Sequence, residues 1–128
     1  MAEPSITRRL QKRFILITAD PALVDEARAH IPGGWEVVPA DALERVGAWN
    51  DILLHRFLIL DADETARYDP VTLVRELRRE MMVNIPVLVV GGDEGRQNEL
   101  RQERADRFFS RDELTGVIES FTAQYDWG

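Results

Sequence analysis

Four short segments rich in apolar residues are spaced along the chain, and each has the length of a β-strand. They are Phe14–Ile17, Trp35–Val38, Phe57–Leu60 and Pro86–Val90. Phe57–Leu60 is apolar at every position, which is typical of a strand buried on both faces of a sheet. Arg107–Phe109 is predicted to form a shorter fifth strand.

Helical patterns occupy the gaps between these segments. Asp20-Pro21 and Asp69-Pro70 each combine an N-cap residue with a proline suited to the first helical turn, and Ser110 with Glu113 forms a capping box. The predicted helix near Glu94–Glu103 is almost wholly polar and is expected to dock weakly. The other predicted helices carry apolar residues at helical spacing within Leu23–Ile31, Asp41–Leu53, Leu73–Met81 and Leu114–Tyr125.

Strand and helix therefore alternate five times. This order predicts an α/β fold, with a doubly wound five-stranded parallel sheet between two helical layers. We expect a basic flexible leader over residues 1–12 and a single domain over residues 13–128. Such sheets bind ligands beyond the carboxyl ends of their strands, where the strand order reverses. The residues expected there are Thr18, Ala19, Asp20, Asp61, Asp63, Gly91, Gly92, Ser110 and Arg111.

Composition narrows the function classes. Residues 14–128 hold 12 Lys/Arg against 22 Asp/Glu, and this acidic body disfavours a nucleic-acid partner. The absence of cysteine excludes disulfides and thiolate metal sites, and it fits a cytoplasmic protein. No apolar run approaches the roughly 20 residues of a membrane span. Of the two histidines, His55 is expected on the surface.

In this order the segments resemble the CheY-like receiver family of response regulators, over about residues 13–125. The likeness rests on Phe57–Asp61, Pro86–Val90 and Ala105–Phe109, and on a spacing from Asp61 to Gly91 that is similar to the family's. The resemblance implies a flavodoxin-like (βα)5 sandwich and a place in two-component signal transduction or a phosphorelay.

The family's phosphorylation chemistry can be carried over position by position. In that family a strand-end aspartate accepts the phosphoryl group, and two acidic residues after the first strand help hold Mg²⁺. A Ser/Thr after the fourth strand and a Lys after the fifth contact the phosphoryl oxygens. Asp61 matches the acceptor, but the acidic pair falls on Thr18 and Ala19, the hydroxyl on Gly91 and the lysine on Arg111.

Further positions leave alternatives open. The family's switch aromatic falls on Phe108, which has no hydroxyl group. Asp20 is expected chiefly to cap a helix, although it is also a candidate substitute for the missing metal carboxylates. Asp63 and Glu64 are candidates for an acidic cluster with Asp61, or simply part of a solvated loop.

The leading hypothesis is a stand-alone pseudo-receiver, not an enzyme and without a cofactor. It would act by protein–protein interaction, with phosphorylation absent or vestigial. The alternative is a functional receiver phosphorylated at Asp61, with Mg²⁺ held by Asp20, Asp61 and Asp63. A third hypothesis is a small-ligand-binding α/β domain.

The expected partner is a protein, either a histidine kinase, a downstream effector or a second copy of the chain. The resemblance implies an interaction face formed by the fourth predicted helix, the fifth strand and the last helix, and here that face carries mixed charges. Its residues are Arg96, Arg101, Arg104, Arg107, Phe109, Glu99 and Glu103.

Overall fold

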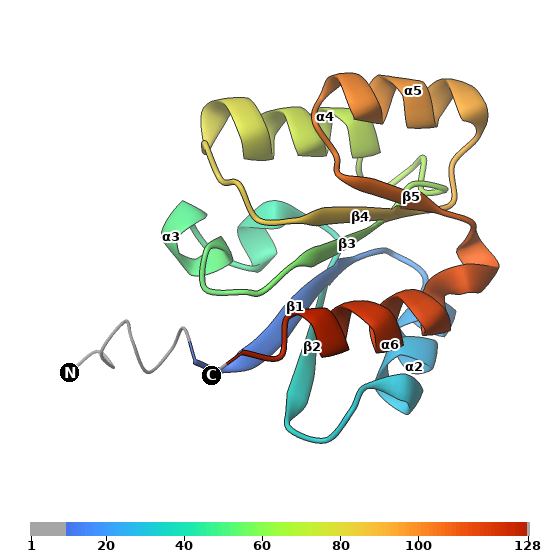
Figure 1. The fold of residues 1–128 in the computed structure, drawn as a ribbon. Helices are drawn as coiled ribbons and strands as arrows, with labels where there is room; N and C mark the ends of the chain where they lie inside the picture. The colour runs from blue at the N-terminus through green and yellow to red at the C-terminus, as the bar shows by residue number, and fades with distance from the viewer. Residues whose placement is uncertain (1–9, 128) are drawn as a thin grey trace.

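The computed structural model describes residues 10–127, which contain one five-stranded sheet (Figure 1). All paired strands run parallel, in the order β2-β1-β3-β4-β5. The doubly wound parallel sheet predicted from the sequence is therefore confirmed. The strands are β1 (Lys12–Ile17), β2 (Trp35–Ala40), β3 (Leu58–Asp61), β4 (Val87–Val90) and β5 (Arg107–Phe109).

Helices cover both faces of the sheet (Figure 1). On one face α2 (Pro21–His30) and α6 (Leu114–Gln124) pack over Phe14, Leu16 and Phe57. The opposite face is covered by η1 (Leu43–Arg45), α3 (Trp49–Ile52), α4 (Pro70–Arg75) with its continuation η2 (Glu76–Glu80), and α5 (Glu94–Gln102). Successive residues of each central strand point to opposite cores, which is why these strands are apolar at every position.

The predicted ends of several elements shift by a few residues. β1 begins at Lys12, inside the predicted leader, whose residues 1–9 lie outside the described part. β2 extends past Val38 to Ala40 and includes Pro39, which an edge strand tolerates because its outer side forms no ladder. β3 extends to Asp61, so the acidic residue is the last member of the strand.

The single helix predicted over Asp41–Leu53 is wrong. The chain forms only the short turns η1 and α3 there, separated at Gly47. Gly47 has φ +142°, outside the helical region, and a Cβ at this position would approach the Asp51 side chain to 2.5 Å. Asp51 accepts a hydrogen bond of 3.0 Å from the Ala48 N–H and so begins α3 anew.

The helix that starts at Pro70 changes its winding at Glu76 and ends as the π-helical segment η2. Within η2 the Arg78 side chain is buried, although the sequence pattern predicts apolar residues for this side of the helix. Its guanidinium donates to the carbonyls of Val83 (3.0 Å) and Ile85 (2.8 Å) and to Asp106 (2.8 Å). A buried arginine thus joins this helix to the start of β4 and the turn before β5.

Among residues 10–127, no helix is long and apolar enough to cross a membrane.

Candidate functional site

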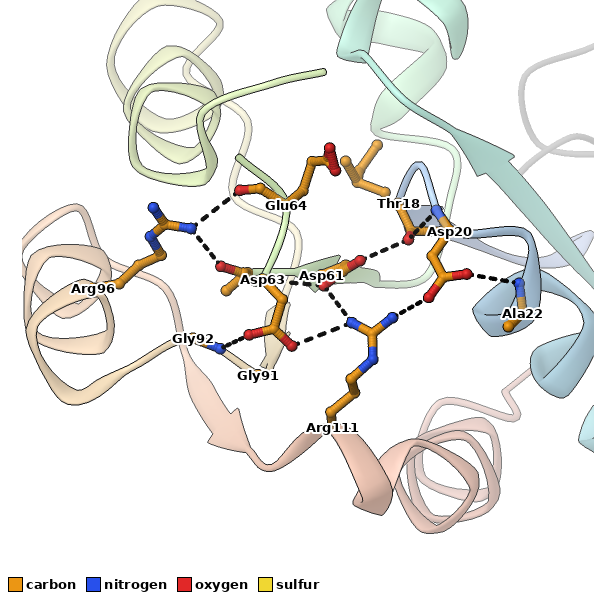
Figure 2. A network of polar contacts seen from close by, with 12 residues as sticks. Thr18, Asp20, Ala22, Asp61, Asp63, Glu64, Gly91, Gly92, Arg96 and Arg111 are labelled. Carbon is orange, nitrogen blue, oxygen red and sulfur yellow. Dashed lines mark hydrogen bonds and ion pairs between the residues drawn. The ribbon is translucent and has the colours of Figure 1, made fainter. Parts of the chain in front are cut away.

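Polar side chains meet at the carboxyl edge of the sheet, beyond the ends of β1 and β3 (Figure 2). Asp61 ends β3 and is 3% exposed. Asp20 follows β1, and Asp63 follows β3 by two residues. All three carboxylates are predicted at this edge from the sequence, and their side chains converge there on one arginine, Arg111.

The buried Asp61 carboxylate is fully hydrogen-bonded. The Thr18 hydroxyl donates to Oδ2 at 2.7 Å. The Asp63 N–H donates to Oδ1 at 3.0 Å, and Arg111 Nη1 donates to the same oxygen at 3.0 Å. Burial of a carboxylate requires such compensation. Thr18, which by resemblance to the receiver family falls where an acidic residue is expected, here supplies a donor.

Arg111 is placed by the capping box that begins the last helical segment. Ser110 N–H donates to Glu113 Oε1 at 2.8 Å, which fixes the turn η3 (Arg111–Glu113). From this turn the Arg111 side chain extends to the carboxylates of Asp61 (3.0 Å), Asp63 (3.2 Å) and Asp20 (Figure 2). A planar guanidinium presents five N–H donors in a fixed fork, so a single side chain reaches all three.

The surroundings of Arg111 favour the charged form of its guanidinium. Burial lowers the pKa of the guanidinium, but the nearby charges of Asp61, Asp20 and Asp63 and the hydrogen bond to Asp63 outweigh burial. The net effect raises the pKa of Arg111 above its usual value, and the side chain remains a cation throughout the ordinary pH range.

Asp20 caps a helix, as the sequence predicts, and also pairs with Arg111. Its Oδ1 accepts from the Ala22 N–H at 2.9 Å and caps α2. Its Oδ2 pairs with Arg111. The cap directs one oxygen toward the helix and leaves the other facing the site. Capping therefore leaves one carboxylate oxygen free to pair with Arg111, which residue order alone does not reveal.

Gly91 shares its space with Asp63. Gly91 has φ +79°, and a Cβ there would collide with the Asp63 carboxylate. That carboxylate also accepts from the Gly92 N–H at 2.8 Å. The hydroxyl residue expected after β4 by resemblance to the receiver family therefore has no room, because an acidic side chain from the β3 loop fills its place.

Tyr68 also belongs to this site, although no sequence pattern predicts it. Its hydroxyl lies 2.7 Å from the Asp61 carbonyl and 3.0 Å from the Ile17 carbonyl, so it bridges the ends of β3 and β1. Burial, followed by the negative charges of Asp61 and Glu64, raises the pKa of Tyr68 and keeps it a hydrogen-bond donor. Tyr68 occupies a loop with no periodic pattern, so only its position before the capping residue Asp69 hinted at an ordered role.

The remaining predicted site positions carry less chemistry. Ala19 lines a cavity on the β2 side of the site and offers no side-chain donor. Phe108 is half-buried against the core, and the Arg101 guanidinium lies 4.4 Å above its ring centre. His55, expected on the surface, is buried, and burial followed by the charge of Arg13 lowers its pKa.

The predicted interaction face is smaller than expected. Arg101, Arg104 and Arg107 are exposed. Arg96 instead donates to the Ala62 (2.8 Å) and Glu64 (3.1 Å) carbonyls beside the site. Two other members face inward, since Phe109 packs edge-on against Phe121 and Glu103 is 6% exposed between Arg75 and Arg79. Glu99 remains exposed on α5.

A magnesium ion does not fit the carboxylates as they are arranged. Asp20, Asp61 and Asp63 are the ligands of the phosphoacceptor alternative, and each points an oxygen at Arg111. No group of three or more His, Asp or Glu side chains suited to a metal ion occurs within residues 10–127. The guanidinium supplies the positive charge that these acids require.

No protein-family model matches the chain, and no curated protein matches it. Solved structures of response regulators do match in three dimensions. The phosphorylated cyanobacterial phytochrome response regulator RcpA is 17% identical, with a TM-score of 0.67 over 90% of this chain and 94% of that one. A signal receiver domain from Bermanella marisrubri is 22% identical, with a TM-score of 0.66 over 86% of this chain and 97% of that one.

HP1043, an orphan response regulator of H. pylori, is 14% identical, with a TM-score of 0.63 over 89% of this chain and 96% of that one. Likeness at such low identity concerns the arrangement of helices and strands. On that ground, and on the strand order described above, the chain has the fold of response-regulator receiver domains.

Proposed function

We propose that this chain is a cytoplasmic signalling module of the pseudo-receiver kind, acting through protein–protein contact without phosphoryl transfer at Asp61. One observation carries the proposal. The Arg111 guanidinium lies against Asp20, Asp61 and Asp63, in the place where the receiver resemblance calls for a divalent ion.

Electrostatics explains why this arrangement opposes phosphorylation. Phosphoryl transfer depends on positioning and on positive charge that neutralises the transferred oxygens. Here the one guanidinium at the site is already paired with three carboxylates, and Thr18 and Arg111 occupy oxygens of Asp61 that would have to attack. The position of the family's hydroxyl residue is filled by the Asp63 carboxylate.

A partner surface remains on α5 and β5. Arg101, Arg104 and Arg107 are exposed there, on a chain whose net charge is −7. We infer that an acidic patch on a kinase, an effector or a second copy of this chain docks at these arginines, because charge complementarity sets orientation and speeds encounter.

Titration of the ¹⁵N-labelled chain with Mg²⁺ and beryllofluoride, followed by NMR, tests the absence of phosphoryl chemistry. We expect no saturable shifts around Asp61. Saturable shifts in the wild-type chain that vanish in Asp61→Asn would establish the phosphoacceptor alternative instead.

The same proposal predicts that the variant Arg111→Ala gains the ability to bind a divalent cation. Removing the guanidinium leaves three carboxylates together, and oxygen ligands of this kind bind divalent cations. Mn²⁺ should then broaden the amide signals of Asp61 and Asp63 in Arg111→Ala, and leave them unchanged in the wild type and in Arg107→Ala. Equal broadening in all three proteins would contradict the proposed role of Arg111.

A further inference from the structure

A cavity of about 460 Å³ lies beside the Arg111 network, on the β2 side of the carboxyl edge. Its walls come from the start of α2, the end of β2, η1 and the loop after β3. The crevice between β1 and β3, where such sheets usually bind ligands, is closed by the Tyr68 hydroxyl and by Arg111. One open space at this edge therefore lies on the β2 side, and another borders α2 and Arg111.

Three arginines from three different elements line this cavity. Arg28 comes from α2, Arg45 from η1 and Arg67 from the loop after β3. All three side chains border the same open space, on a chain whose net charge is −7.

Two of the three guanidiniums have no acidic partner. Arg45 pairs with Asp41 at 2.8 Å, but neither Arg28 nor Arg67 makes a side-chain hydrogen bond or ion pair within residues 10–127. The lining acid Asp20 is engaged by Arg111. The lining holds three arginines and three aspartates in all, so its formal charge is zero, and the guanidiniums of Arg28 and Arg67 are the cations that remain available to an anion.

Part of the lining is apolar. Pro21, Val24, Pro39 and Ala40 contribute carbon surface beside the arginines. Small-molecule sites combine such a surface with a few convergent polar groups, and they have volumes of roughly 300–1,000 Å³. Guanidinium forks match the paired oxygens of phosphate and carboxylate groups.

We propose that this cavity binds a small organic dianion, a phosphate monoester or a dicarboxylate. The charged groups of the dianion would contact Arg28 and Arg67, and its carbon skeleton would pack against Val24 and Pro39. This site is distinct from the phosphoacceptor position and does not depend on the proposed function. It touches the Arg111 network through Thr18 and Asp20, which line the cavity as well.

NMR titration of the full chain with four probes tests the proposal. The probes are phenyl phosphate, phthalate, inorganic phosphate and neutral benzyl alcohol. We expect saturable shifts of the Val24, Arg28 and Asp41 amides with phenyl phosphate, phthalate or both, weaker shifts with inorganic phosphate, and none with benzyl alcohol. Saturation by phenyl phosphate alone assigns phosphate esters, and saturation by phthalate alone assigns dicarboxylates.

Variants separate a built site from general attraction to arginine. The double variant Arg28→Gln, Arg67→Gln should weaken binding roughly tenfold or more, as loss of a charge-assisted hydrogen bond implies. Arg107→Gln, an exposed arginine of β5, should bind as the wild type does. Both variants replace exposed side chains, and matching wild-type spectra away from the cavity verify their folds.

Three results would overturn the proposal. One is the lack of saturable shifts with either organic anion. Another is unchanged affinity in the double variant. The third is a set of shifts that extends equally to Arg101 and Arg107, which would indicate unspecific attraction.

Discussion

Gly91 shows how one residue can exclude a chemistry. Its φ of +79° is strained for any other residue, and the Asp63 carboxylate fills the volume that a side chain would need. The glycine after β4 thus leaves room for the Asp63 carboxylate, where a Ser or Thr at this position would place its own hydroxyl group.

Gly91→Ser is expected to destabilise the protein by about 2 kcal/mol or more, through backbone strain and the collision with Asp63. Gly33→Ser is the matched control, because no atom lies within 4 Å of a Cβ there and the cost should stay within about 0.5 kcal/mol. Urea unfolding of both variants gives the comparison. The cost of Gly91→Ser should shrink in an Asp63→Ala background, and an unchanged cost there would exclude the collision.

Local sequence patterns predict the positions of two residues of the site. The strand-end position of Asp61 and the capping role of Asp20 both follow from local patterns, because a strand end and a helix start are local events. The reach of Arg111 and the bridge made by Tyr68 depend on long side chains crossing to residues far along the chain. Rotamer choice at such distances has no signature in local sequence.

At the scale of elements, charged side chains fasten the polar helix α5 that was expected to dock weakly. Leu100 is its only buried apolar residue. The Glu103 carboxylate after the helix pairs with Arg75 at 3.1 Å and Arg79 at 3.4 Å, and Arg78 donates to the Arg104 carbonyl at 3.2 Å. Ion pairs thus compensate for the small apolar contact of this helix.

Arg78→Met is expected to lower the free energy of unfolding by about 2–3 kcal/mol, because it leaves buried carbonyls without donors. Arg79→Met on the same helix removes one half-exposed ion pair and should cost less than about 1 kcal/mol. Hydrogen exchange at the start of β4 reports the local effect. Equal losses in the two variants would show that burial of Arg78 contributes nothing.

Element prediction succeeded where apolar runs or caps were strong, and failed over Asp41–Leu53. That segment has apolar residues at helical spacing, but Gly47 adopts a backbone angle that no helix allows. The pattern fixes which side chains face the core. It does not fix whether one helix or two short turns deliver them.

At the scale of the whole molecule, Arg56 joins distant parts of the described chain at the amino edge of the sheet. Its guanidinium donates to the carbonyls of Leu10 (2.8 Å), Tyr125 (2.8 Å) and Trp127, and it stacks 3.6 Å from the Trp127 ring centre. This edge lies opposite the candidate site. Arg56 therefore holds the first and last described segments of the chain together and takes no part in ligand binding at the carboxyl edge.

Arg56→Leu is expected to release both segments and to lower stability by about 2 kcal/mol or more, since three carbonyls lose a charged donor. Lys12→Gln, which removes the half-exposed pair with Asp126 at 2.7 Å, is the control and should cost less than about 1 kcal/mol. Amide exchange should accelerate near residues 10–14 and 121–127 in Arg56→Leu alone. Unchanged protection of these amides from exchange in Arg56→Leu would contradict the proposed role of Arg56.

The arginine among the three carboxylates has a consequence that reaches beyond the site. A metal ion binds and dissociates according to its concentration in solution. The Arg111 guanidinium is covalently part of the chain, so its effective concentration at the three carboxylates is constant. Neither a chelator nor dilution can remove it. The acidic edge therefore keeps its counter-charge for as long as the chain is folded, whatever the surrounding fluid contains.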